Sequence, residues 1–123
     1  MSTSDSTKSI KFANKTVEKA FQALPWDIQV SFITSLDMVC QGRKPELEID
    51  YLTSVAKGVI ELKINGSPAY RCVYYNKLDD VVVVVAAFVK TTNGSPTKEL
   101  SGIKTRVSDL KKPREKPKPK PKK

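Results

Sequence analysis

The sequence predicts an α+β domain in which helices pack against one face of a small antiparallel sheet. Three observations support this fold class. Apolar residues recur at helical spacing between residues 14 and 40, strand-like segments joined by turn signals follow between residues 59 and 90, and another helical pattern covers residues 96–110. We expect one domain over residues 9–110, with an N-terminal helix pair on one face of the sheet and a C-terminal helix.

The N-terminal part is predicted to hold a short edge strand, "SIKF" at residues 9–12, and two antiparallel helices. Asn14 is the expected N-cap of the first helix, and Pro25 either ends this helix or opens the next one. The second helix runs from Trp26 to Cys40 and ends at Gly42. Its predicted apolar stripe consists of Phe32, Ile33, Leu36, Val39 and Cys40. The segment "RKPELEIDY" that follows is predicted to be a charged connector.

Three strands are predicted to follow as an antiparallel meander. In "VIELKI" (residues 59–64), Ile60, Leu62 and Ile64 share one face, and Glu61 and Lys63 point to the other. The turn "NGSP" leads to a strand over residues 69–76, and "KLDD" leads to the run "VVVVVAAFVK". A run this apolar indicates a strand that is buried on both sides for most of its length.

The last predicted helix begins after the turn "TTNG", with Ser95 as its cap and Pro96 at its first position. It extends to about Leu110. Its expected apolar stripe consists of Leu100, Ile103, Val107 and Leu110.

The ends of the chain, residues 1–8 and 111–123, are predicted to be disordered. The C-terminal segment carries eight Lys or Arg and one Glu, so it supplies +7 of the net charge of +9. Alternating Pro and Lys favour an extended, self-repelling chain. This tail is either a solubilising segment or an arm that binds RNA, DNA or anionic lipid, with nucleic acid favoured because no apolar anchor accompanies the charge. The candidate RNA-binding residues are Lys111, Lys112, Arg114, Lys116, Lys118 and Lys120.

Composition excludes several kinds of chemistry. The chain contains no histidine, which removes Ser-His-Asp and Cys-His catalysis and His-ligated zinc, and no Gly-rich phosphate loop is present. Cys40 and Cys72 are predicted to be small core residues. No cofactor is expected. The longest apolar run, residues 81–89, is too short for a membrane helix, so no membrane association and a cytoplasmic location are expected.

Charged residues on the sheet form the candidate site. Alternation places Arg71 with Ala69 and Val73, and Lys90 with Ala86 and Phe88. If the helices cover the Ile60 face, a suitable register brings Glu61, Lys63, Arg71 and Lys90 together on the open face. The alternative is that these are ordinary polar residues on a solvated face, with Lys90 marking the end of the strand.

The segment "GVIELKINGSPAYRCVYYNKLDDVVVVVAAFVKTTNGSPTKEL" resembles the RelE/HigB superfamily of toxins from toxin–antitoxin modules, especially its phage-derived branch. The resemblance covers about residues 11–110. Thr91 stands where the family has the second lysine of a Lys-Lys pair, and no tyrosine or histidine follows Phe88. The matching residues are Glu61, Leu62, Lys63, Tyr70, Arg71, Tyr74, Phe88, Lys90, Thr92 and Pro96.

This resemblance implies a RelE-like fold and a metal-independent endoribonuclease that cleaves mRNA, usually on the ribosome, through attack of the 2′-hydroxyl on the neighbouring phosphate. It also implies a cognate antitoxin, often a small helix-turn-helix protein. By this carry-over Arg71 holds the phosphate, and Lys90 is a clamp or acid. Lys63 is a further cation, or a general base with a pKa lowered by its cationic neighbours, and Glu61 orients Arg71 or accepts the proton.

Other interpretations remain open at the sequence level. Tyr70 and Tyr74 are packing residues or, as the second choice, stack on an RNA base. The chain as a whole is alternatively a non-catalytic phage factor of the same fold that binds RNA or protein, or a toxin with a protein target such as gyrase. Fold alone does not choose among these functions.

Overall fold

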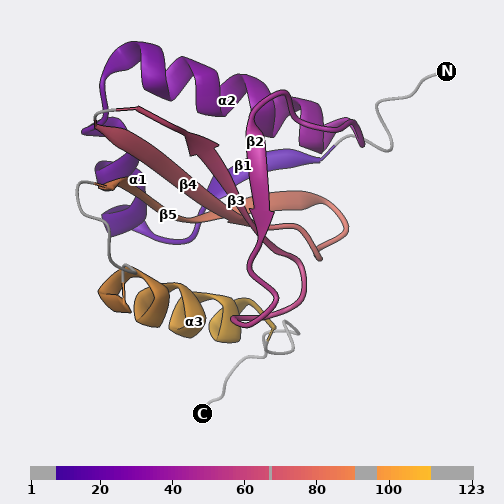
Figure 1. Cartoon of the computed structure of the whole chain (residues 1–123). Helices are drawn as coiled ribbons and strands as arrows, with labels where there is room; N and C mark the ends of the chain where they lie inside the picture. Colours follow the sequence, from indigo (N-terminus) through magenta and orange to yellow (C-terminus); the bar gives the residue numbers. More distant parts are fainter. Residues whose placement is uncertain (1–7, 67, 91–96, 112–123) are drawn as a thin grey trace, which may run out of the picture.

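The computed structural model describes residues 8–66, 68–90 and 97–111. These residues form three helices and a five-stranded sheet of order β1-β5-β4-β3-β2 (Figure 1). The α+β fold class predicted from the sequence is confirmed. In chain order the elements are β1 (Ser9–Phe12), α1 (Lys15–Gln22), α2 (Trp26–Cys40), β2 (Glu48–Tyr51), β3 (Val59–Ile64), β4 (Ala69–Tyr75), β5 (Val81–Lys90) and α3 (Thr97–Lys111).

The two N-terminal helices begin and end where their capping residues predict. The side chain of Asn14 accepts a 2.9 Å hydrogen bond from the backbone N–H of Val17, which satisfies a free donor at the start of α1. At the end of α2, Gly42 has a positive φ of 77°, and the N–H of Arg43 donates to the carbonyl of Met38 over 2.8 Å. This glycine-dependent Schellman arrangement satisfies carbonyls that would otherwise lack a partner.

The predicted meander is confirmed, because β3, β4 and β5 pair in antiparallel order. The predicted N-terminal edge strand is confirmed as β1, which lies parallel to β5. The prediction of a connector over "RKPELEIDY" is wrong in part, since Glu48–Tyr51 forms β2 and pairs with β3. Only Ile49 of this short strand packs against the core, so β2 has too little apolar alternation to resemble a strand.

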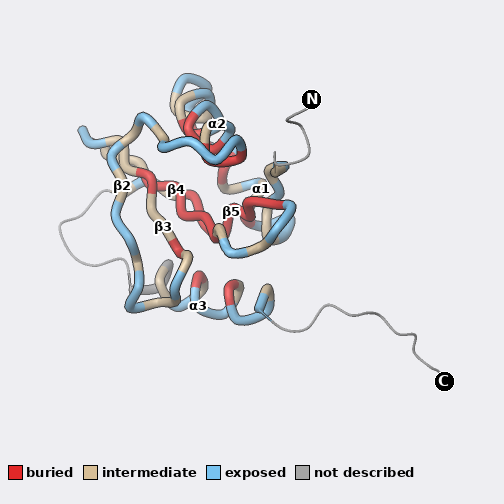
Figure 2. The backbone as a smooth tube through the Cα atoms, turned by 90° about the vertical axis from the view of Figure 1, so that its right-hand side faces the viewer, coloured by how far each residue is buried: buried red, intermediate tan, exposed pale blue. Residues whose placement is uncertain are grey.

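Helices cover both faces of the sheet, so the predicted N-terminal helix pair on one face is confirmed, and the expectation that every helix packs on that face is wrong for α3. Helices α1 and α2 lie on one side of the sheet and α3 on the other (Figure 2). The valine run explains this arrangement, because Val82 and Val84 face α1 and α2 while Val81, Val83 and Val85 face α3. A strand that is apolar on both faces needs a cover on each. The predicted apolar stripe of α3 packs on this second face, as expected.

An irregularity divides β5 at Val85. Val73 of β4 lies opposite Ala86, but the next residue, Tyr74, lies opposite Val84, so Val85 is an extra residue in β5. Such a bulge disturbs the ladder and leaves a residue without a strand partner. Arg106 of α3 supplies one, because its Nη1 donates a 2.7 Å hydrogen bond to the carbonyl of Val85.

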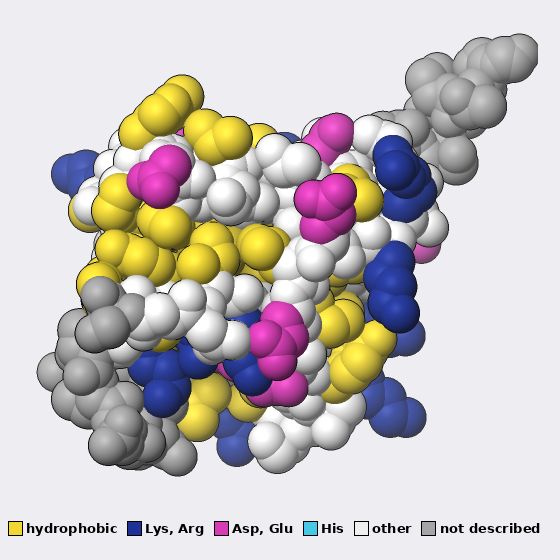
Figure 3. Space-filling model, turned by 45° about the horizontal axis from the view of Figure 1, so that its top comes forward, with side chains coloured by type: hydrophobic (Ala, Val, Ile, Leu, Met, Phe, Trp, Pro, Cys, Tyr) yellow, Lys and Arg dark blue, Asp and Glu magenta, His cyan; other side chains and the backbone are white. Residues whose placement is uncertain are grey.

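Other predictions about burial have mixed outcomes. Cys40 and Cys72 are buried free cysteines, as predicted, and burial raises the pKa of both thiols. Ile33 is exposed rather than in the core, and with Trp26 and Val30 it lies on the outer side of α2. Figure 3 shows hydrophobic side chains at the surface on this side of the molecule. The described helices are all too short or too polar to cross a membrane.

Several predictions fall outside the described residues. These are the caps Ser95 and Pro96, the N-terminal residues 1–7, and the tail from Lys112 onwards, including Arg114, Lys116, Lys118 and Lys120. Lys111 is described and is the exposed last residue of α3.

Candidate functional site

The register of the sheet brings the predicted cations onto one face. Lys63 of β3 lies directly opposite Arg71 of β4, which in turn lies opposite Phe88 of β5. Lys90, two residues beyond Phe88, lies opposite Ala69. Directly opposed residues in antiparallel strands project from the same face. The three cations and Glu61, two residues before Lys63, therefore share a face, because the sheet has the register on which this expectation depended.

This face is not open along its whole length, because α3 packs on it. Val59, Val73, Val81 and Val83 lie beneath α3 with Ile103 and Val107. The charged residues occupy the other part of the face, towards the start of β4 and the end of β5, where Ala69 and Lys90 pair. The expectation of an uncovered sheet face is therefore wrong. This face has an apolar part that α3 covers and, beside it, an end that carries the charged residues.

Arg71 is held in place by neighbouring backbone and by Glu61. Only 7% of this residue is exposed. Its Nη1 donates to the carbonyl of Tyr70 over 3.0 Å and lies 3.5 Å from that of Ile64, and its Nε lies 3.9 Å from Oε2 of Glu61. The fixed orientation follows from these contacts, because a guanidinium in the core must satisfy its donors locally.

Glu61 has a pKa raised above its ordinary value. Burial is the main cause, and the carboxylate of Asp50 adds to it, while the charges of Arg71, Lys63 and Lys90 act in the opposite direction. A carboxylate shifted towards neutral pH is suited to accept a proton.

Lys63 does not match the predicted lysine of lowered pKa. Its Nζ forms a 2.9 Å salt bridge with Oδ2 of Asp50 on β2, and the hydrogen bond from this ammonium to Asp50 raises its pKa. A lysine of raised pKa stays protonated at neutral pH. The role of general base therefore does not fit Lys63, and the role of fixed cation does.

Tyr70 and Tyr74 lie on the face opposite to the charged cluster. Tyr74 is buried in the core beneath α1 and α2, and burial raises the pKa of its hydroxyl. Tyr70 is half-buried and packs against the same core. The packing interpretation is confirmed for both, and neither ring lies on the face of Arg71.

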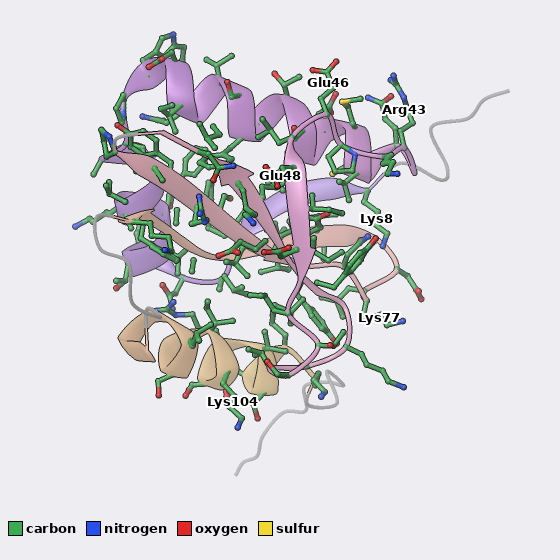
Figure 4. The ribbon with its side chains drawn as sticks, viewed as in Figure 1. Lys8, Arg43, Glu46, Glu48, Lys77 and Lys104 are labelled. Carbon is green, nitrogen blue, oxygen red and sulfur yellow. The ribbon has the colours of Figure 1, made fainter. Side chains whose placement is uncertain are left out.

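Two residues near the site were missed by sequence reasoning. Asp50 was assigned to a connector, although the outward position of Glu48 and Asp50 around Ile49 in "EID" was a weak strand signal. Arg106 belongs to the polar side of the last predicted helix, and nothing in the sequence links it to the carbonyl of Val85. In contrast, Lys104 points from the same helix away from the sheet (Figure 4).

The described residues include no group of three or more His, Cys, Asp or Glu side chains that could hold a metal ion. The family model described as "Phage derived protein Gp49-like (DUF891)" matches residues 19–108 of the chain. This range covers α2, the whole of β2 to β5 and most of α3. No curated protein matches the chain.

Proposed function

We propose that this chain is the toxin of a type II toxin–antitoxin module, because it belongs to the phage-derived Gp49-like family, a RelE/HigB-like toxin-type family. In this proposal the toxin is a metal-independent endoribonuclease that cleaves mRNA on the ribosome. Its cognate antitoxin in this proposal is a small helix-turn-helix protein. The observation that supports nuclease chemistry is the convergence of Arg71, Lys63, Lys90 and Glu61 on one face.

In the proposed reaction, the ribose 2′-oxygen attacks the neighbouring phosphorus, the bond from phosphorus to the 5′-oxygen breaks, and a 2′,3′-cyclic phosphate forms. Glu61 accepts the 2′-hydroxyl proton, for which its raised pKa is suited. Lys90 protonates the departing 5′-oxygen. Arg71 binds the phosphate through those of its five N–H donors that do not contact Tyr70, Ile64 or Glu61, and it stabilises the charge that develops on the phosphate oxygens.

Lys63 contributes positive charge without transferring a proton. Its salt bridge to Asp50 keeps it ionised and fixes it beside Arg71. The exposed side chain of Asp50 also reduces the net charge of the cluster, which limits its attraction for a phosphate.

A non-catalytic binding function is the second candidate, and the same pairing favours it. Arg71 is almost fully buried and Lys63 is paired, so the charges of these two cations are partly neutralised within the protein. In this alternative the chain binds RNA through its basic tail, Lys111–Lys123, and the sheet performs no reaction.

Expression of the chain alone in bacteria, followed by measurement of growth and of transcript integrity, tests the nuclease proposal. The native chain is expected to stop growth and fragment mRNA. Lys90→Gln is expected to reduce cleavage about 100-fold, a typical effect of removing one transition-state donor. Lys104→Gln, on the outer side of α3, is the matched control and should leave cleavage unchanged.

Arg71→Lys is the second test variant, because it retains the charge but removes the planar fork that contacts phosphate. Circular dichroism should show both variants to be folded. Growth arrest with intact transcripts would overturn the nuclease proposal in favour of a protein target such as gyrase. Harmless expression, with RNA binding lost on deletion of residues 111–123, would support the binding function. Relief of toxicity by the neighbouring reading frame would support the antitoxin partner.

A further inference from the structure

The outer edge of β5 is paired for only part of its length. β1 pairs with Val81 to Val84, and beyond this pairing the N–H of Ala13 donates a 2.9 Å hydrogen bond to the carbonyl of Val84. β5 extends further, and no strand within residues 8–66, 68–90 and 97–111 pairs with its outer edge from Ala86 to Val89. Such an edge presents the N–H and C=O groups of alternate residues.

A groove runs along this unpaired edge between α1 and α3. Its volume is about 350 Å³, and its walls include Thr16 and Ala20 of α1, Ala86 and Ala87 of β5, and Gly102 and Arg106 of α3. Most of these side chains are small, and the larger side chains of Val17 and Phe88 complete the lining. At Gly102, an added Cβ would lie 3.3 Å from the guanidinium of Arg106, so glycine leaves room for this arginine against the helix. The small walls allow another backbone to approach β5.

The end of β5 also exposes apolar surface. Val89, on the same strand face as Ala87, is 41% exposed, whereas Val82 and Val84 earlier on that face are fully buried. The apolar cover provided by α1 and α2 therefore stops before the strand does. An added strand would place side chains beside Val89 and reduce this exposure.

The charges around the groove favour an acidic occupant. Arg106 lies in its wall, and Lys19 is exposed on α1 between Thr16 and Ala20. Lys15 is exposed one turn earlier, and Glu18, which is half-buried, is the acidic residue of this helix. Arg106 is thus the charged residue among the groove-lining residues, and a cation in the wall favours an acidic side chain, because complementary charge gives specificity to an interface.

We propose that the outer edge of β5 from Ala86 to Val89 binds an extended acidic peptide segment of a partner protein as an added strand. The main-chain groups would form the ladder, and alternate side chains would point towards α1 and towards α3. An acidic side chain on the α3 side would lie beside Arg106. This inference rests on the edge and its groove, and it does not depend on nuclease activity. Single-stranded RNA shares the negative charge but lacks the alternating N–H and C=O groups of a strand.

Selection of a displayed library of random heptapeptides on the full chain tests this proposal. The selected peptides are expected to be acidic with β-branched or aromatic residues at alternate positions. Their binding, measured by fluorescence anisotropy, should weaken at least about tenfold in Ala20→Trp, which fills the groove. Gln22→Trp is the matched control, because Gln22 is exposed on the same helix and does not line the groove.

Methylation of the peptide backbone tests pairing without altering the protein. Methyl groups on the nitrogens of one alternating set of residues should abolish binding, and methyl groups on the other set should have little effect. Equal effects of the two sets, or binding that Ala20→Trp does not change, would overturn strand addition at this edge. Absence of selected peptides, with an oligoribonucleotide bound in a manner sensitive to Ala20→Trp, would overturn it in favour of RNA.

Discussion

The two parts of β5 have different surroundings although they belong to one strand. Residues Val81–Val84 pair with β1 on one edge and with β4 on the other, and helices cover both of their faces. Residues Ala86–Lys90 pair with β4 on one edge, and exposure rises from the buried Ala86 and Ala87 to the exposed Val89, with Lys90 half-buried. A single strand therefore supplies a rigid scaffold in its first part and, a few residues later, an accessible edge with a cation.

The change occurs where β1 turns into α1. The N–H of Ala13 donates a hydrogen bond to the carbonyl of Val84, and after this residue the chain leaves the sheet. On the other edge of β5, Val85 forms the bulge in the pairing with β4. A bulge increases local twist, and bulges are common beside functional sites. The first part of β5 thus holds the second part in place, with Lys90 on the same face of the sheet as Glu61.

Substitution of the same residue type in the two parts should give the largest contrast. Val84→Asp introduces a charge into the core between β1 and β4, and we expect the cooperative thermal transition to be lost, with a cost above about 4 kcal/mol. Val89→Asp adds the same charge at an exposed position, and stability should change by less than about 0.5 kcal/mol. Thermal melts followed by circular dichroism measure both, and similar losses in the two variants would contradict the division of β5.

Glu61→Gln should lower the rate of RNA cleavage and change how the free energy of unfolding depends on pH. As the proposed base, Glu61 is expected to contribute about 100-fold to cleavage. Its pKa is raised in the folded protein, so between its ordinary value and the raised one the folded state binds more protons than the unfolded state. The free energy of unfolding should therefore fall as pH rises through this interval. Gln does not titrate, and urea denaturation at a series of pH values should show this fall removed in the variant. An unchanged slope would mean that Glu61 is not shifted.

Arg106→Met should have a smaller effect on stability. Methionine retains much of the apolar stem but cannot donate to the carbonyl of Val85. We expect a loss of about 1 kcal/mol, equivalent to roughly 4–8 °C in melting temperature for a domain of this size. Lys104→Met on the outer side of α3 should melt like the native chain. An equal loss in the two variants would indicate a general helix effect rather than support of the bulge.

Asp50→Asn should have the smallest effect on stability. Its salt bridge with Lys63 is partly exposed, and such pairs contribute below about 0.5 kcal/mol in most cases. The pKa of Lys63, followed by nuclear magnetic resonance of its ε-carbon, should nevertheless fall towards its ordinary value when the carboxylate is removed. A pKa that remains raised would assign the shift to another neighbour.

Much of the fold could be predicted from local patterns. Asn14 and Gly42 mark helix ends because each satisfies a particular backbone geometry, and alternation assigns Ile60, Leu62, Glu61 and Lys63 to their faces. The meander follows from turn residues and short connections. β2 could not be predicted, since its pairing with β3 relies on non-local hydrogen bonds and its sequence offers one inward apolar side chain.

The candidate site was predicted in part. Alternation within each strand gave the side of Arg71 and of Lys90, but only the register between strands brings them onto one face with Lys63. The raised pKa of Lys63 could not be anticipated, because Asp50 reaches it from a strand that the sequence did not reveal.

The sequence by itself determined the elements that depend on neighbouring residues: helix caps, the alternation of the strands and the doubly apolar character of the valine run. Only the tertiary structure decided which helix covers which face, where the bulge lies and which carboxylate pairs with Lys63. These features depend on contacts between residues distant in the chain, such as Arg106 with Val85 and Lys63 with Asp50. Local patterns carry no information about such pairs, because many registers satisfy the same alternation and the packing of the whole domain selects one.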